Sequence, residues 1–60
     1  MVDYEILTDR QVLHRADTRG IVVTQVQTIR VEGRHFEVKF WRDWETGALA
    51  RVDSVERPAP

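Results

Sequence analysis

The stretch His35-Phe-Glu-Val-Lys-Phe-Trp-Arg-Asp-Trp44 decides the fold. Its side chains alternate in character, which is typical of a strand with two different faces, and it carries both tryptophans and both phenylalanines. The turn signal Glu32-Gly33 precedes it, and Glu45-Thr46-Gly47 follows it. We therefore expect this stretch to be the central strand of a twisted antiparallel meander, with strands at about residues 21–31, 35–44 and 48–55.

The two turns also predict the register. A two-residue loop at Glu32-Gly33 and a three-residue turn ending at Gly47 are both common hairpin connections. The expected cross-strand pairs are Ile29–Phe36, Gln27–Val38, Phe40–Val52, Arg42–Ala50, Trp41–Arg51 and Lys39–Asp53. In this register Trp41 forms a cation–π pair with Arg51, and Lys39 forms an ion pair with Asp53. Each is worth ~1 kcal/mol or less.

The segment Ile21–Val31 has high strand propensity, because β-branched residues dominate it. Its alternation is imperfect, since Val22 and Val26 have the opposite parity to Ile29. Either both faces of this strand are partly covered, or a bulge near Gln25–Gln27 changes the parity.

The N-terminal segment adds a short strand at about residues 2–7 and then leaves two alternatives. Thr8 and Gln11 fit a capping box for a short helix that ends near Ala16, whereas Val12–Ala16 can also form a second strand. The strand is favoured, because so short a helix is weak without strong packing. We expect this segment to pack across one face of the meander, and an SH3-like partial barrel is one form of that arrangement.

The expected organisation is a single small, mostly β domain over residues 1–56, followed by a disordered tail over residues 57–60. Pro58 and Pro60 are the reason for placing the boundary there. The predicted core consists of Ile6, Leu13, Val23, Ile29, Val31, Phe36, Val38, Phe40 and Val52.

Composition excludes several classes of protein. The 60 residues contain no cysteine, so disulfides and thiolate metal sites are excluded. The net charge of -1 is not typical of a general polyanion binder, which usually has a clear basic excess. The apolar runs are short, as at Ile21-Val22-Val23, whereas a membrane span needs ~20 such residues. We expect a soluble cytoplasmic protein of bacterial or phage origin with no membrane partner.

No catalytic or metal motif is present. His14, His35 and Ser54 have no spacing that indicates a triad or a ligand set, and each glycine is single and fits a turn rather than a phosphate loop. We therefore expect no enzymatic activity, no metal and no cofactor.

Trp41 carries the main functional expectation, because its parity is opposite to that of Phe36 and Phe40. One interpretation is that Trp41 is exposed beside arginines and anchors a partner. The other is that it packs beneath the N-terminal segment. From the first we predict a contact set of Trp41, Arg42, Arg51 and, more weakly, Tyr4.

The predicted function is a non-catalytic protein-binding module, either an inhibitor or an accessory or regulatory subunit. Its partner would be a larger protein or a second copy of the chain. The alternative is a single-stranded nucleic-acid-binding module that stacks bases on aromatic rings and contacts phosphates with arginine. The carboxylates of Glu37 and Asp43 beside Trp41 make this alternative less favoured.

Overall fold

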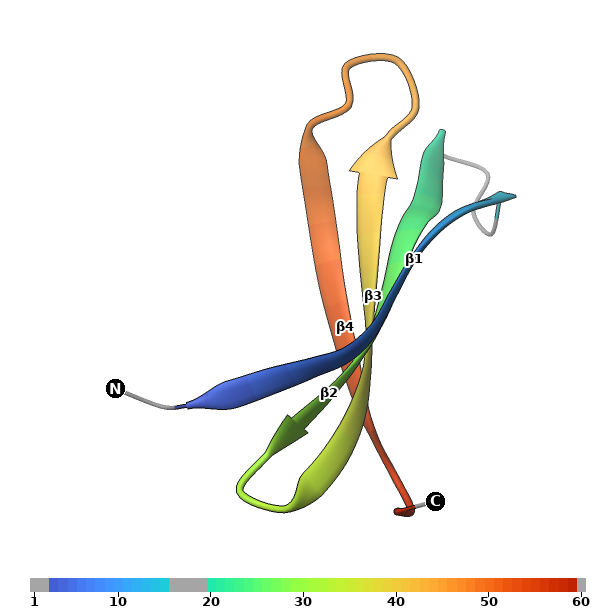
Figure 1. Ribbon diagram of the computed structural model, residues 1–60. Helices are drawn as coiled ribbons and strands as arrows, with labels where there is room; N and C mark the ends of the chain where they lie inside the picture. The colour runs from blue at the N-terminus through green and yellow to red at the C-terminus, as the bar shows by residue number, and fades with distance from the viewer. Residues whose placement is uncertain (1–2, 16–19, 60) are drawn as a thin grey trace.

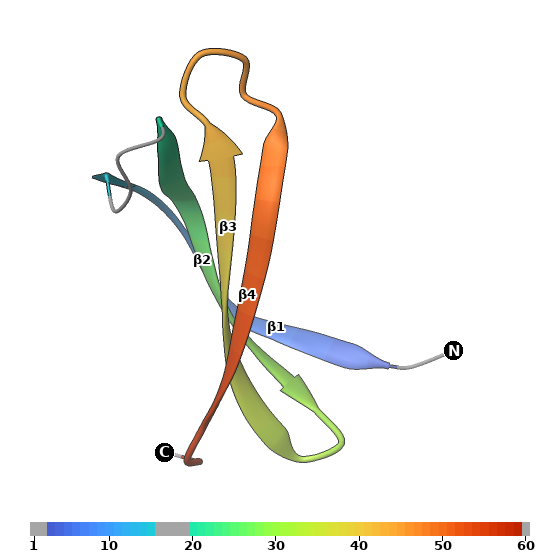
Figure 2. The same cartoon turned by 180° about the vertical axis from the view of Figure 1, so that it is seen from behind.

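The chain folds into one antiparallel sheet of four strands, and the computed structural model describes residues 3–15 and 20–59. Neighbours along the chain are neighbours in the sheet, so β1 and β4 form its two edges (Figures 1 and 2). The bounds are Tyr4–Arg15 for β1, Ile21–Val31 for β2, Arg34–Asp43 for β3 and Leu49–Arg57 for β4. The described residues contain no helix. The predicted meander is confirmed, with one strand added at its N-terminal edge.

The N-terminal segment is a single long strand, so the alternative of a short helix ending near Ala16 is wrong. β1 pairs with β2 from Tyr4 to Arg15, and two irregularities, at Leu7 and at Val12–Leu13, each shift the register without ending the strand. Continuous pairing satisfies backbone groups that an isolated short helix would leave open. Arg57, which we expected in the tail, is the last residue of β4. Other predictions for residues 1–2, 16–19 and 60 lie outside the described residues.

The sheet is open, and the predicted partial barrel is wrong. The sheet is strongly twisted, so β1 and β4 run at a wide angle to each other (Figures 1 and 2). No ladder of hydrogen bonds joins these two edges in the described chain. The N-terminal segment also does not lie across a face of the meander, because it is an edge strand in the same layer.

The β2–β3 connection is the predicted two-residue hairpin. Val31 pairs with Arg34, and the intervening Glu32 and Gly33 have φ values of 52° and 78°. Two successive positive φ values are typical of a type I′ turn, whose twist matches that of the flanking strands. The predicted pairs Ile29–Phe36 and Gln27–Val38 are both confirmed.

The β3–β4 loop consists of residues 44–48, whereas the prediction was residues 45–47. The backbone N–H of Asp43 donates to the carbonyl of Ala48, and the N–H of Gly47 donates to the carbonyl of Asp43, both at 2.9 Å. The Asp43 carboxylate accepts from the N–H groups of Glu45 and Thr46 at 2.8 and 3.1 Å. This local capping holds the loop closed, and it removes Trp44 from the strand.

The longer loop also shifts one predicted pair. Arg42 lies opposite Leu49 rather than Ala50, and Ala50 is an extra residue in β4. Beyond this bulge the predicted pairs Trp41–Arg51, Phe40–Val52 and Lys39–Asp53 are confirmed.

A bulge at Thr24 explains the imperfect alternation of β2. Val23 lies opposite Trp41 while Gln25 lies opposite Phe40, so Thr24 is the extra residue, just before the range predicted. The bulge brings Val23 and Val26 to the same face despite their opposite parity.

The two faces of the sheet differ in chemistry, and we name them after β3. The tryptophan face carries Glu37, Lys39 and Trp41, and the phenylalanine face carries Phe36, Val38 and Phe40. The packed apolar cluster lies on the tryptophan face and consists of Val23, Val26 and Trp41, with Val12 and Ile21 against it.

The predicted core is therefore only partly correct. Val23 and Val38 are buried, and Ile29, Val31, Phe36 and Phe40 are half-buried. Ile6, Leu13 and Val52 were predicted to be buried but are 47%, 63% and 48% exposed. These predictions fail because a second layer does not cover the sheet, so parity alone does not bury a residue.

Candidate functional site

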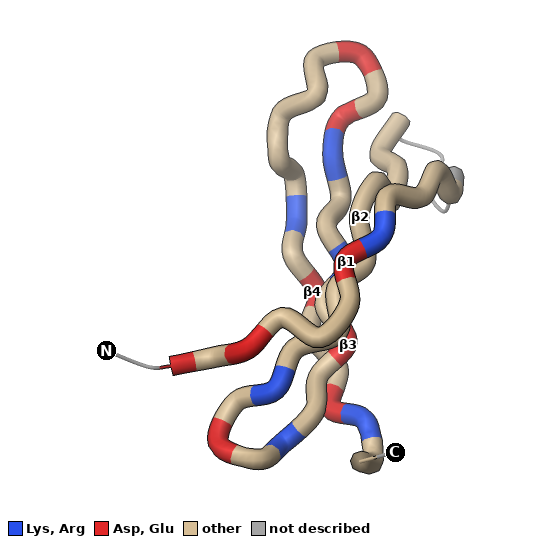
Figure 3. Tube along the Cα trace, in the orientation of Figure 1, with Lys and Arg blue, Asp and Glu red and all other residues tan. Residues whose placement is uncertain are grey.

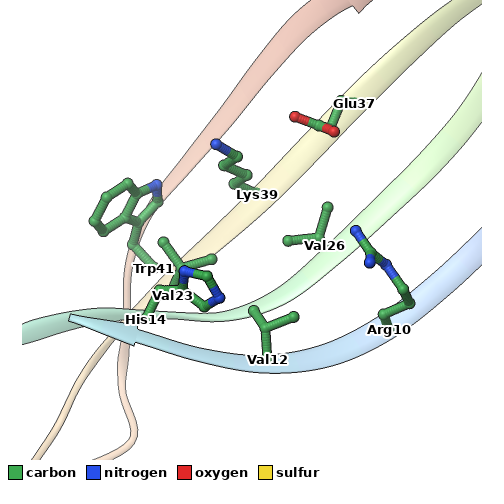
Figure 4. A pocket seen from close by; sticks show the side chains of 8 residues that line it. All are labelled: Arg10, Val12, His14, Val23, Val26, Glu37, Lys39 and Trp41. Carbon is green, nitrogen blue, oxygen red and sulfur yellow. The ribbon is translucent and has the colours of Figure 1, made fainter. Parts of the chain in front are cut away.

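A groove of ≈ 380 Å³ lies on the tryptophan face (Figure 4). Its lining comes from three neighbouring strands and consists of Arg10, Val12, His14, Val23, Val26, Glu37, Lys39 and Trp41. The valines form the floor, and the longer side chains stand around them (Figure 4). The site is therefore an apolar hollow with a polar rim, which is the general form of a binding site.

The strand register determines where the two cations of the rim, Arg10 and Lys39, lie. Arg10 lies opposite Val26 on one side, and Lys39 lies opposite Val26 on the other. Because adjacent strands are ~4.8 Å apart, the Cα atoms of the two cationic residues are separated by roughly 10 Å. An acidic group above Val26 is thus within reach of both long side chains.

Trp41 closes one end of the groove and is 8% exposed, so the expectation of an exposed Trp41 is wrong. Two neighbours cover it. Val23 packs against it on the sheet, and the guanidinium of Arg51 lies 4.3 Å from the ring centroid. Arg51 is held in turn by Asp53, with Nε 3.3 Å from a carboxylate oxygen. The predicted Lys39–Asp53 ion pair is thereby replaced by a pair within β4.

Three donors around the groove have no acceptor among the described residues. The indole Nε1 of Trp41 is buried without a hydrogen-bond partner. The guanidinium of Arg10 and the ammonium of Lys39 form no ion pair within residues 3–15 and 20–59. Figure 4 shows the indole nitrogen on the edge of the ring nearest to Lys39. The unsatisfied indole N–H costs ~1–3 kcal/mol, whereas the exposed cationic groups of Arg10 and Lys39 can be reached by an incoming acceptor.

The one carboxylate in the groove lining is already engaged. Glu37 Oε1 accepts from the guanidinium of Arg57 at 3.2 Å, at the end of the groove away from Trp41. Acids and bases otherwise alternate along the described chain without a region of one sign (Figure 3). The groove therefore has a local excess of positive charge because Glu37 is paired with Arg57, although the chain as a whole has no basic excess.

The predicted contact set separates into different regions. Trp41 and Arg51 lie side by side, as predicted from the register. Arg42 follows Trp41 in the strand and so lies on the phenylalanine face, where it donates to the Gly47 carbonyl at 3.0 Å. Tyr4 is exposed but pairs with Val31, near the opposite end of the sheet. Only Trp41 and Arg51 therefore lie together, whereas Arg42 lies on the other face and Tyr4 at the other end of the sheet.

The exposed tryptophan is Trp44 instead, at 54%. It lies in the β3–β4 loop, and its backbone N–H donates to the carbonyl of Gly20 at 2.9 Å. The sequence did not reveal this exposure, because the loop was placed one residue too late.

The groove residues of β1 were also missed. Arg10, Val12 and His14 reach Trp41 only because β1 continues without interruption along β2. The predicted strand at Val12–Ala16 would have placed these residues beside β2 if it had been joined to the strand predicted at about residues 2–7.

The residues considered for catalysis do not form a site. His35 lies opposite Arg30 on the tryptophan face, whereas Ser54 lies opposite Val38 on the phenylalanine face. His14 lies at the other end of the sheet, opposite Val23. Within the described ranges no three His, Cys, Asp or Glu side chains gather as ligands for a metal ion, and no helix there has the length and apolarity to span a membrane.

Comparison with protein-family models, with curated protein sequences and with solved structures found no significant match. The functional argument therefore depends on the geometry of the sheet alone.

Proposed function

We propose that this chain is a non-catalytic protein-binding module that holds an acidic segment of a partner protein in the groove of the tryptophan face. The observation that supports this most directly is the pair of cations, Arg10 and Lys39, beside an apolar floor and without an ion-pair partner in the described residues. Such a module acts as an inhibitory or accessory subunit, because it contributes contacts rather than chemistry.

The cations and the apolar floor of the groove determine which kind of peptide segment would bind there. A carboxylate above Val26 accepts from Arg10 and Lys39, which flank that valine in one cross-strand row. A charge-assisted hydrogen bond contributes ~1.5–3 kcal/mol when it is shielded from water, and less when it is exposed. An apolar side chain next to the acid fills the space between Trp41 and the valines. The preferred segment thus carries an acidic residue beside an aliphatic or aromatic one.

The burial of Trp41 argues for a peptide rather than a nucleic acid. A base-stacking platform needs an open aromatic face, but the ring of Trp41 is covered by Arg51 at 4.3 Å. The net charge of -1 also gives no general attraction for phosphates. Single-stranded nucleic acid remains the alternative that the experiment must separate.

The test is selection from a random peptide library displayed on phage, followed by calorimetric titration of the recovered peptides. The selected sequences should be enriched in Asp or Glu next to a large apolar residue. Lys39→Met retains the aliphatic stem but removes the charge, and it should weaken binding about tenfold, which equals ~1.4 kcal/mol. The matched control is Arg30→Met, because Arg30 lies on the same face outside the groove, where it is paired with Glu5 at 2.9 Å.

Three outcomes overturn the proposal. One is the absence of any enriched sequence, and another is enrichment without an acidic residue. The third is equal loss of affinity in Lys39→Met and Arg30→Met, which would indicate a general charge effect. A fluorescent oligo-dT probe tests the alternative, because nucleic-acid binding should fall steeply with added salt. Tight oligonucleotide binding that Lys39→Met abolishes would replace the peptide with a nucleic acid.

A further inference from the structure

The phenylalanine face is an apolar sheet surface without a covering layer. Ile29, Phe36 and Phe40 are half-buried, and the flanking edge strands contribute Ile6 and Val52, which are about half exposed. Leu49 extends the surface at one end, where it lies opposite Arg42. The described residues form a single sheet, and the molecule measures 15 Å along its shortest axis. Stable domains bury such a face against a second layer ~10 Å away.

The charged side chains that the structure describes on the phenylalanine face have partners within the chain. Asp9 accepts from the side-chain amides of Gln25 and Gln27 at 2.9 and 3.2 Å. Arg34 is paired with Glu56 at 2.6 Å, and Arg42 donates to the carbonyl of Gly47 at 3.0 Å. A covering layer therefore needs no charges of its own. The groove differs, because Arg10 and Lys39 have no ion-pair partner among the described residues and favour an anionic ligand.

We infer that the phenylalanine face is covered by the same face of a second copy of this chain. An apolar surface whose described charged groups are already paired is complementary to itself, and a two-fold axis repeats each contact in both copies. The two larger dimensions, 36 and 25 Å, give each copy a face that is large enough for the ~800 Å² per partner of a standard stable interface. Two such twisted sheets pack face to face at about -30°. The dimer would be a two-layer sandwich with both grooves on its outer surfaces.

Two valines of β4 provide a matched test. Val52 lies opposite Phe40 on the phenylalanine face, and Val55 lies opposite Glu37 on the tryptophan face. They are 48% and 52% exposed and belong to the same strand. Val52→Lys places a charge in the inferred interface, whereas Val55→Lys places the same charge on the outer surface. Ile6→Lys, at the other edge of the interface, is a second disrupting variant.

The experiment is sedimentation velocity of the full chain and the three variants over a hundredfold range of concentration. The wild type and Val55→Lys should sediment as dimers, and Val52→Lys and Ile6→Lys as monomers. Far-UV circular dichroism with thermal melting verifies that each variant is folded, so that loss of the dimer is not confused with loss of the fold. A monomeric wild type overturns the inference. Retention of the dimer in folded Val52→Lys and Ile6→Lys also overturns it and indicates pairing through a strand edge. These outcomes do not depend on whether a peptide occupies the groove.

Discussion

Replacement of Trp41 is the most direct test of how this sheet is held together. The side chain is 8% exposed and is a member of the packed cluster with Val23 and Val26. A buried Trp→Ala substitution costs ~3–5 kcal/mol, and loss of the Arg51 contact adds ~0.5–1 kcal/mol. Removal of the unpartnered indole N–H returns ~1 kcal/mol. We therefore expect Trp41→Ala to lower the free energy of unfolding by about 3–4 kcal/mol.

This loss is large for so short a chain. Native domains have stabilities of roughly 0.05–0.15 kcal/mol per residue, which gives about 3–9 kcal/mol for 60 residues. If the wild-type stability is at the lower end of this range, Trp41→Ala should be largely unfolded at 25 °C. Trp41→Phe keeps most of the apolar volume and removes the N–H group, so its loss should be about 1 kcal/mol.

The chain supplies its own matched control. Trp44→Ala removes the same side chain from the β3–β4 loop, where 54% of it is exposed, and a surface change of this kind is usually within ~0.5 kcal/mol. The measurement is urea denaturation followed by far-UV circular dichroism, at one protein concentration for all variants. A folded Trp41→Ala whose stability falls by less than 1 kcal/mol would refute the reasoning. Equal losses at Trp41 and Trp44 would refute it as well, because burial would then not distinguish the two.

Four further substitutions, one of them combined with acidification, test the turns and one ion pair. Gly33→Ala should cost about 1 kcal/mol in urea denaturation, because the residue has a φ of 78°, whereas Glu32→Asn should stabilise by ~0.5 kcal/mol, since Asn-Gly is the preferred type I′ pair. Asp43→Ala should cost ~1 kcal/mol and increase hydrogen exchange at the two loop amides that it caps. Arg34 donates to Glu56 and so lowers the pKa of that carboxyl below its ordinary 4.5. The ion pair therefore stabilises the fold above pH 4.5, and this stabilisation is lost as the pH falls through the pKa of Glu56 in the folded state. Acidification below pH 4.5 should thus reduce the urea midpoint less in Arg34→Gln than in the wild type.

The centre of the sheet was predictable because turn chemistry leaves little freedom. A two-residue loop at Glu32-Gly33 permits one register, and every pair from Ile29 to Val31 follows from it. The pair Trp41–Arg51 was also correct, although the loop length behind it was not. A bulge at Ala50 restores the predicted register beyond the longer loop.

Burial was less predictable, because it depends on what lies above each face. Alternation assigned Phe36 and Phe40 to one side and Trp41 to the other, and this was correct. It did not indicate which side has the packed cluster. That side was decided by a bulge at Thr24, which brings two valines beneath the tryptophan. Long-range coverage of this kind has no local signal in a single sequence, and the groove was missed for the same reason.

The two faces make opposite demands on whatever covers them, and this is why we assign them to different partners. On the tryptophan face the apolar cluster is closed by the chain itself, and cationic Arg10 and Lys39 remain without acceptors in the described residues. On the phenylalanine face the described charged groups are paired, and apolar side chains such as Ile6 and Val52 remain exposed. An acidic peptide satisfies the first demand and would leave the second unmet, whereas a second copy does the reverse. Because only the proposed dimer would add a second layer, it predicts that folding and self-association are linked and that the free energy of unfolding rises with protein concentration.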